Sequence, residues 1–235
     1  MVDMKPLESF DWRSRFRPAL IHLAASLLVA MAVAAIVFAL WYPGVYRTLS
    51  GGTELFLLVV GVDWALGPLI TFVIFDRRKP VHELRRDVAV VIALQVAALG
   101  YGLHMMGISR PVALALEEDR FRVVAASGIY EKELPAALPE FRSLPLTGPR
   151  LVRSVTPTDP NKKLESIGLG LSGYDTGTRP SLWQPWDDKA RAEALAHAKP
   201  LTALAQRHAA RRAELDDVVS ATGRAAQALV YVPMV

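Results

Sequence analysis

Three long apolar stretches fill the first half of the chain, and polar residues become dense only between and after them. The stretches run from Ala19 to Leu40, from Leu55 to Phe75 and from Val88 to Ser109. Each is close to the roughly 20 apolar residues that a helix needs to cross a bilayer. Buried helices of soluble proteins seldom run this far without a polar face. The pattern therefore predicts three transmembrane helices, because lipid offers no partners to the backbone amides of irregular structure.

The first apolar stretch has arginines before it, as a secretory signal peptide would. It is longer than the apolar region of about 7 to 15 residues in such a peptide. It also ends in Trp41, Tyr42 and Pro43, which resemble an interfacial aromatic belt more than a cleavage site. We therefore interpret the first stretch as a retained membrane anchor.

Basic residues are distributed unevenly over the loops. Residues 1–18 carry several, whereas the loop 41–54 carries only Arg47. The loop after the second stretch carries Arg77, Arg78, Lys79, Arg85 and Arg86. Because cytoplasmic loops are enriched in Lys and Arg, we predict that these five residues determine the topology, with residues 1–18 and the second loop in the cytoplasm. The net charge of +4 is explained by this topology and by contact with anionic membrane lipids rather than by nucleic acid.

One acidic residue, Asp63, lies inside the second apolar stretch. It is about eight residues from the outer end, or about 12 Å deep at 1.5 Å per residue. A carboxylate at that depth must face protein rather than lipid. Tyr101 in the third stretch has a similar depth and is the expected partner, and Gln95, about 9 Å deeper, is the second choice. His22 is expected to lie too far away.

Pro68 removes a backbone hydrogen bond one turn after Asp63, so we expect a kink there. Small residues spaced four apart, which let helices approach closely, recur in all three stretches as Ala30 and Ala34, Gly61 and Ala65, and Ala98 and Gly102. We predict an intramembrane site that binds a partner helix, formed by Asp63, Trp64, Gly67, Pro68, Gln95 and Tyr101. The alternatives are an internal anchor that only holds the bundle together, or part of a proton or ion path.

Residues 110–235 have the composition of a soluble domain. The segments 111–126 and 151–155 and the end of the chain predict strands, with the terminal strands able to pair. Helices are expected after Asp187 and from Pro200. The predicted fold class is therefore a membrane protein with three transmembrane α-helices (19–109) followed by a small α+β domain (110–235).

Known catalytic and metal-binding patterns receive no support. The chain has no cysteine, and its histidines lack ligand spacing. The segment GLGLSG (168–173) matches a nucleotide-binding pattern, but turn-like residues follow it, so we expect a turn. Trp183 and Trp186 are interpreted as packing residues, with an exposed binding ledge as the alternative. We predict no catalytic, cofactor-binding or metal-binding residues.

Several groups of residues together resemble the TfpX/TfpZ family of type IV pilin accessory proteins. They are Asp63, Leu66, Gly67, Pro68, Leu69 and Thr71; Lys79, Pro80, Glu83, Leu84, Arg85, Arg86 and Asp87; Gln95, Tyr101 and Gly102; Arg110, Pro111, Asp119, Arg120, Phe121 and Val123; and AKPLTAL (198–204).

The resemblance implies a non-enzymatic protein of the bacterial inner membrane that binds or stabilises the major type IV pilin and assists pilus assembly, with its C-terminal domain in the periplasm. Inner-membrane pilus assembly proteins are further partners that it suggests, and it implies no cofactor. Two other classes stay open. One is a membrane-embedded enzyme that modifies pilin or a lipid-linked substrate, and the other is a membrane-tethered periplasmic sensor.

Overall fold

The computed structural model describes residues 12–76 and 78–235. The chain divides into two compact units, one ending at Ile108 and the other beginning at Ser109. The first contains long apolar helices, and the second is a mixed α/β unit with a four-stranded sheet. This arrangement of elements confirms the predicted fold class.

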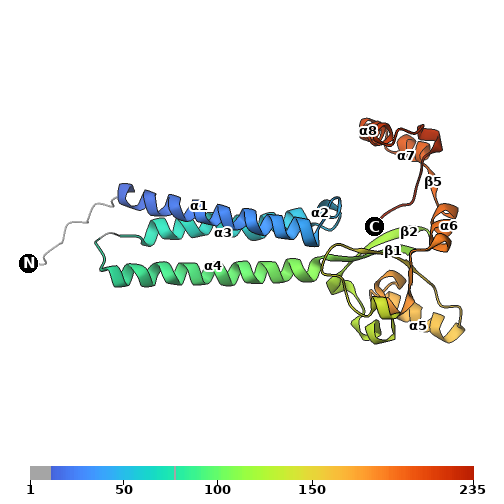
Figure 1. The fold of residues 1–235 in the computed structure, drawn as a ribbon, viewed down its shortest axis with the longest axis horizontal. Coiled ribbons are helices and arrows are strands. Elements are labelled where there is room, and N and C mark those ends of the chain that lie inside the picture. The colour runs from blue at the N-terminus through green and yellow to red at the C-terminus, as the bar shows by residue number, and fades with distance from the viewer. Residues whose placement is uncertain (1–11, 77) are drawn as a thin grey trace, which may run out of the picture. The chain divides into compact units, whose positions relative to one another are not determined.

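Three long helices make up most of the described part of the helical unit (Figure 1). All three are long and apolar enough to cross a membrane, so the predicted spans are confirmed. All three begin before the apolar stretches, in the flanking sequence. The elements are α1 (Trp12–Ile36), continued by a π-helical turn (Val37–Trp41), the short α2 (Tyr46–Leu49), α3 (Gly52–Ile74) and α4 (Val81–Ser109).

Tyr42 closes one end of the helical unit. It is fully buried beside Val37 and Phe56, and its hydroxyl donates a hydrogen bond to the carbonyl oxygen of Met106 at 2.9 Å. Its ring occupies the space left by Gly52 at the start of α3, where an added Cβ would lie 2.5 Å from the ring. The expectation that Tyr42 belongs to an interfacial belt is therefore wrong, because the ring packs between helices instead of facing the lipid interface.

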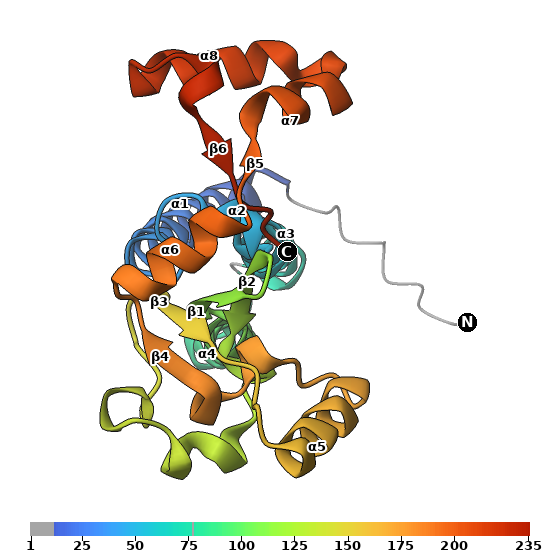
Figure 2. The ribbon, with the colours of Figure 1, turned by 90° about the vertical axis from the view of Figure 1, so that its right-hand side faces the viewer.

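The sheet of the second unit has the strand order β2-β1-β3-β4 (Figure 2). Strand β1 pairs antiparallel with β2 and parallel with β3, and β3 pairs antiparallel with β4. The strands predicted at 111–126 and 151–155 are confirmed. The bounds are β1 (Pro111–Glu117), β2 (Arg120–Ala125), β3 (Arg150–Ser154) and β4 (Trp183–Pro185).

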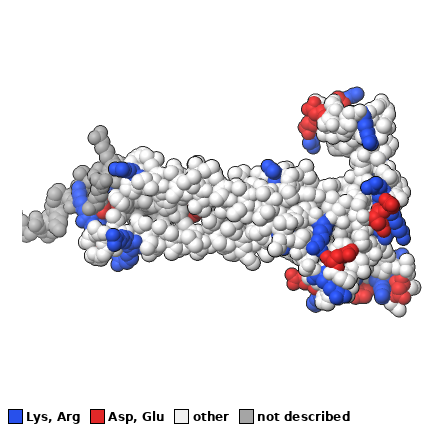
Figure 3. All heavy atoms as spheres, in the orientation of Figure 1, with Lys and Arg blue, Asp and Glu red and all other residues white. Residues whose placement is uncertain are grey.

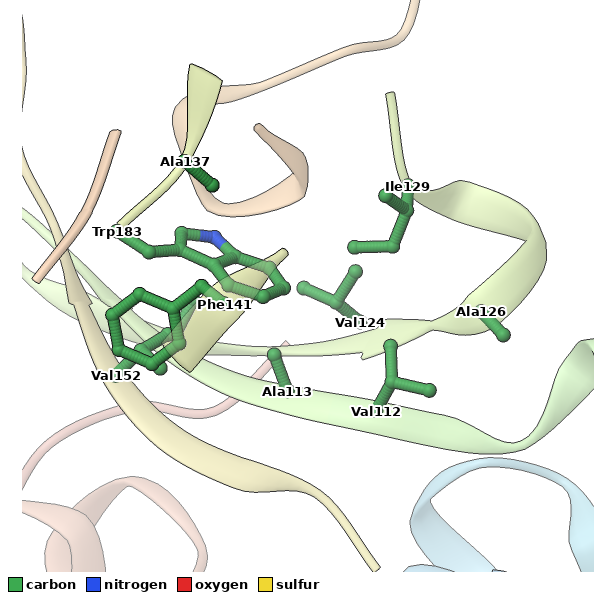
Figure 4. Close-up of a cluster of buried hydrophobic side chains, with 10 residues drawn as sticks. Val112, Ala113, Val124, Ala126, Ile129, Ala137, Phe141, Val152 and Trp183 are labelled. Carbon is green, nitrogen blue, oxygen red and sulfur yellow. The ribbon is translucent and has the colours of Figure 1, made fainter. Parts of the chain in front are cut away.

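Trp183 lies at the centre of the core of this unit. Figure 4 shows its indole over Val112, Ala113 and Val124 of the β1–β2 hairpin. Phe141 meets it edge to face, with the ring centroids 5.8 Å apart. The packing interpretation of Trp183 is therefore confirmed.

Four α-helices follow β3 in the described chain. Asp159 and Asp187 cap the first two, each accepting a hydrogen bond from a backbone N–H of the first turn. The start of a helix after Pro200 is confirmed. Residues 168–171 were expected to form a turn, but they are the last residues of a helix. The bounds are α5 (Pro160–Leu171), α6 (Asp188–Ala196), α7 (Leu201–Arg207) and α8 (Arg212–Thr222).

A narrow two-stranded ribbon, β5 (Lys199–Pro200) with β6 (Val230–Tyr231), connects α7 and α8 to the rest of the unit (Figure 2).

At the start of α8, the hydrogen bond from the Arg211 guanidinium lowers the pKa of the exposed Glu214 carboxyl.

The last residues of the chain lie along the edge of the four-stranded sheet. The backbone N–H of Phe121 in β2 donates to the carbonyl oxygen of Pro233 at 2.8 Å, and that of Val123 donates to Val235 at 3.0 Å. The two ends of the unit therefore meet, through an isolated bridge at Met234 that covers part of the β2 edge, whereas the last strand of the chain, β6, pairs with β5.

We predict that Trp183→Ala destabilises the mixed unit by about 3 to 5 kcal/mol, because it empties the centre of the core. The change also removes the hydrogen bond from the indole N–H to the carbonyl oxygen of Gly177, which is 2.8 Å long. Limited proteolysis of the detergent-solubilised full chain, followed over a temperature series, measures the effect. Leu171→Ala is the control, since this side chain is 88% exposed. Equal protease resistance of the two variants would contradict the assignment of the core.

Candidate functional site

A groove opens between the three long helices of the membrane unit. Its volume is about 470 Å³, and apolar side chains of α1 and α4, together with Phe75 just after α3, form most of its walls. The polar side chains that line it are His22, Ser26, Asp63, Thr71 and Gln95. An apolar groove with a few convergent polar groups is the usual form of a binding site.

Gln95 of α4 is the centre of a hydrogen-bond network that joins the three helices. Its Oε1 is 2.6 Å from Nε2 of His22 on α1, and its Nε2 donates to the backbone carbonyl of Asp63 on α3 at 3.3 Å. Nδ1 of His22 is 2.6 Å from the hydroxyl of Thr71 on α3. An amide oxygen only accepts, so His22 donates from Nε2, and in the neutral imidazole Nδ1 is then the acceptor for the Thr71 hydroxyl. His22, which we expected to be remote, is therefore part of the site.

Two glycines set the distance between α3 and α4. At Gly67 an added Cβ would lie 2.0 Å from the amide nitrogen of Gln95, and at Gly102 it would lie 2.4 Å from Val59. Each glycine is the space into which a side chain of the other helix fits. Gly61 has nothing within 4 Å of such a Cβ, so the expected helix contact at Gly61 is wrong.

Asp63 lies deeper in the membrane helix than the sequence suggested. Helix α3 begins at Gly52, so Asp63 is midway along it, about 16 Å from each end at 1.5 Å per residue. Tyr101 is 69% exposed, and the structure shows no hydrogen bond between it and Asp63. The expected contact between Asp63 and Tyr101 is therefore wrong. The second choice, Gln95, does contact Asp63, but its side-chain amide bonds to the backbone carbonyl of Asp63 and not to the carboxylate.

The remaining residues of the predicted site differ in exposure. Trp64 is 49% exposed on the outside of the bundle. Pro68 lies inside α3, which continues as a helix to Ile74. The structure thus brings Asp63, Gly67 and Gln95 together. Their binding of a partner stays a prediction.

Arg15 of α1 caps the C-terminal end of α3. Its guanidinium donates to the backbone carbonyls of Phe72 and Val73 and forms an ion pair with Asp76 at 3.2 Å. The Arg15 side chain is only 11% exposed. Terminal carbonyls of a helix lack partners within it and favour cations, so this contact fixes the start of α1 against the end of α3.

Four of the five predicted topology residues lie near this end of the unit, where Figure 3 shows Lys and Arg gathered beside a long uncharged surface. Lys79 donates to the carbonyl of Ile74 at 3.3 Å and pairs with Asp87 at 2.7 Å. Arg78, Arg85 and Arg86 are exposed, and Arg77 lies outside the described residues. Lys79 therefore has a structural contact in addition to its predicted effect on topology.

A second polar cluster lies in the mixed unit, beside a cavity of about 500 Å³. The buried Glu117 accepts hydrogen bonds from Arg122 at 2.9 Å, from Arg120 at 3.2 Å and from the backbone of Gly177 at 3.0 Å. Arg122 also pairs with Asp175 at 2.7 Å. The members of this cluster satisfy one another and hold the β1–β2 hairpin against the loop after α5, which carries Asp175 and Gly177. The groove is therefore the stronger candidate site.

Larger residues at the two contact glycines are expected to separate α3 from α4. We predict that Gly102→Leu lowers the melting temperature of the detergent-solubilised chain, since overpacking of this kind costs about 1 to 3 kcal/mol. Gly61→Leu is the matched control on a neighbouring helix and should melt like the unchanged chain. Equal melting of both variants would show that Gly102 is not a helix contact.

Comparison with known proteins shows the family to which this chain belongs. The family model described as "Fimbrial assembly protein FimB" matches residues 10–51, which include α1 and the loop after it. Fimbrial assembly proteins of Dichelobacter nodosus, from serogroups E1 and I, are each 36% identical over 163 residues, covering 69% of this chain and 63% of theirs. No solved structure matches.

The chain thus spans less than two thirds of the length of these two relatives. A third relative, the fimbrial assembly protein of serogroups C1 and C2 from the same organism, is 37% identical over 117 residues, which are 50% of this chain and 89% of that protein. The expected family is confirmed at the level of fimbrial assembly, while the narrower TfpX/TfpZ assignment stays an expectation. The chain is a membrane protein of the fimbrial assembly protein FimB family.

Proposed function

We propose that this protein assists the assembly of type IV pili by holding the membrane-spanning helix of the pilin against the groove between α1, α3 and α4. The observation that carries the proposal is the groove itself, whose walls belong to a chain of the fimbrial assembly family. The names of the relatives support a role in pilus assembly. The geometry of the groove supports a helix as the bound partner.

A membrane helix suits the groove for physical reasons. Apolar side chains gain little by leaving lipid, so helices associate in a bilayer through close packing and hydrogen bonds. The walls are fixed in place by the glycine contacts of α3 and α4 and by the Gln95 network. Side chains of a partner helix can therefore enter a space of about 470 Å³ that does not have to form first.

The role that we propose is binding rather than catalysis. His22, Thr71 and Gln95 are engaged with one another and hold helices together. Inner-membrane pilus assembly proteins are further candidate partners, and anionic lipids suit the exposed Arg85 and Arg86.

The orientation belongs to the same proposal. Arg17, Arg85 and Arg86 lie at or near one end of the bundle helices, whereas Arg47 is the basic residue of the loop at the other end. The distribution of basic residues supports a cytoplasmic start of α1 and a cytoplasmic loop between α3 and α4. The mixed unit would then lie in the periplasm, where the globular head of a membrane-anchored pilin is found.

A bulky side chain that fills the groove should block binding of the partner helix. We predict that Val96→Trp, which places an indole into the groove, lowers the amount of co-expressed type IV pilin that purifies with the full chain by about tenfold, as expected for a penalty of ~1.4 kcal/mol. The matched control is Val90→Trp, because Val90 lies exposed on the same helix and does not line the groove. Equal recovery of pilin with both variants would reject the groove as the binding site.

The orientation can be tested with single cysteines, since the natural chain contains none. We predict that Ser127→Cys reacts with a membrane-impermeant maleimide in intact spheroplasts and that His82→Cys reacts only after lysis. Both positions are exposed in the structure, so access to the membrane side decides the outcome. The reverse labelling pattern would overturn the proposed topology.

A further inference from the structure

Asp63 lies between two glycine contacts that join α3 to α4. Val59, Asp63 and Gly67 are spaced four apart and follow one stripe of α3. Val59 meets Gly102, and Gly67 meets Gln95. Because both neighbours on the stripe are held against α4, the position of Asp63 at the groove is held as well.

The other strongly polar side chains of this part of the groove already have partners. Both ring nitrogens of His22 are engaged, and Gln95 uses its oxygen for His22 and its nitrogen for the backbone of Asp63. Within residues 12–76 and 78–235, the structure shows no hydrogen bond or ion pair to the Asp63 carboxylate. The Asp63 carboxylate is therefore a charged acceptor of the groove that the groove's own side chains do not satisfy.

The depth of Asp63 limits what could satisfy this acceptor. Asp63 is at the middle of α3, about 16 Å from either end, which is half the thickness of a hydrocarbon core of about 30 Å. Lipid headgroups lie at the faces of the bilayer, and acyl chains carry no donors. A donor at this depth must therefore come from a side chain of another membrane helix.

We propose that the helix bound in the groove carries a hydrogen-bond donor, a hydroxyl, amide or ammonium group, that meets the Asp63 carboxylate at the middle of the bilayer. This inference rests on the proposed function and names the chemistry by which the groove recognises its partner. The apolar walls accept many helices, whereas a single polar contact in lipid selects the helix with a donor at the matching depth. The same contact fixes how far the partner helix slides along α3.

The test compares Asp63→Leu and Asp63→Asn with the unchanged full chain, by recovery of co-expressed type IV pilin from membranes in mild detergent. Asp63→Leu leaves the partner's donor unsatisfied and should lower recovery by about tenfold, which corresponds to ~1.4 kcal/mol. Asp63→Asn keeps an acceptor oxygen without the charge. Recovery close to that of the unchanged chain identifies a neutral donor, and recovery as low as with Leu identifies a cation.

Melting of each variant in detergent separates binding from folding. Asp63 holds no other side chain in the described structure, so Asp63→Leu should melt at or above the temperature of the unchanged chain. If the melting temperature of Asp63→Leu fell, a substitution in the pilin would decide whether the loss of recovery reflects binding or folding. Replacing the pilin's donor by leucine should then lower recovery with the unchanged chain and have no added effect with Asp63→Leu.

The outcomes distinguish this inference from the proposed function. If Val96→Trp loses pilin and Asp63→Leu retains it, the groove binds pilin through apolar contacts alone. The proposed contact between a donor of the partner helix and Asp63 is then refuted. If both variants retain pilin, the proposed function fails together with this inference. Loss of self-association or of a co-purified phospholipid with Asp63→Leu, at unchanged pilin recovery, would assign the groove to a second copy or to lipid and overturn the inference.

Discussion

A lipid bilayer offers almost no hydrogen-bond partners, and this constraint accounts for most of the polar contacts in the helical unit. His22, Thr71 and Gln95 satisfy one another across three helices. Arg15 and Lys79 satisfy the last carbonyls of α3, where the helix itself provides no donors. Each contact removes an exposed polar group and at the same time ties two helices together. The bundle is therefore held at its glycine contacts, its polar network, its basic end and the buried cluster around Tyr42 at the other end, and its walls elsewhere are free to face lipid or a partner.

The sequence predicted the three spans because length and apolarity alone decide whether a helix can cross a bilayer. It did not predict which faces meet. Depth favoured Tyr101 as the neighbour of Asp63, but a helix that is apolar all round carries no amphipathic pattern from which its rotation can be read. The available signal was spacing. Gln95 and Gly102 are seven residues apart and share a face of α4, which Tyr101 does not, and Gly67 offered the matching space on α3.

In the mixed unit, β-branched alternation was enough to predict β1, β2 and β3, since they pair locally or fill the core. Helix α5 was missed because Gly168 and Gly170 are typical of turns, although Asp159 followed by Pro160 is a strong signal for the start of a helix. The buried ion pair of Arg179 with Glu133, 2.7 Å long, could not have been predicted. The two residues are far apart in sequence, and only the finished fold brings them together.

The pairing of residues 233–235 with β2 has a consequence for the behaviour of the unit in solution. An uncovered edge strand is a template onto which a strand of another molecule can add, and natural proteins protect such edges. Here the protection comes from the far end of the domain, after the excursion through α7 and α8. A chain cut within that excursion and released from its last residues would keep its sheet but lose the cover over the amides of Phe121 and Val123, so that proteolytic nicking around α8 would uncover an edge onto which a strand of another copy can add.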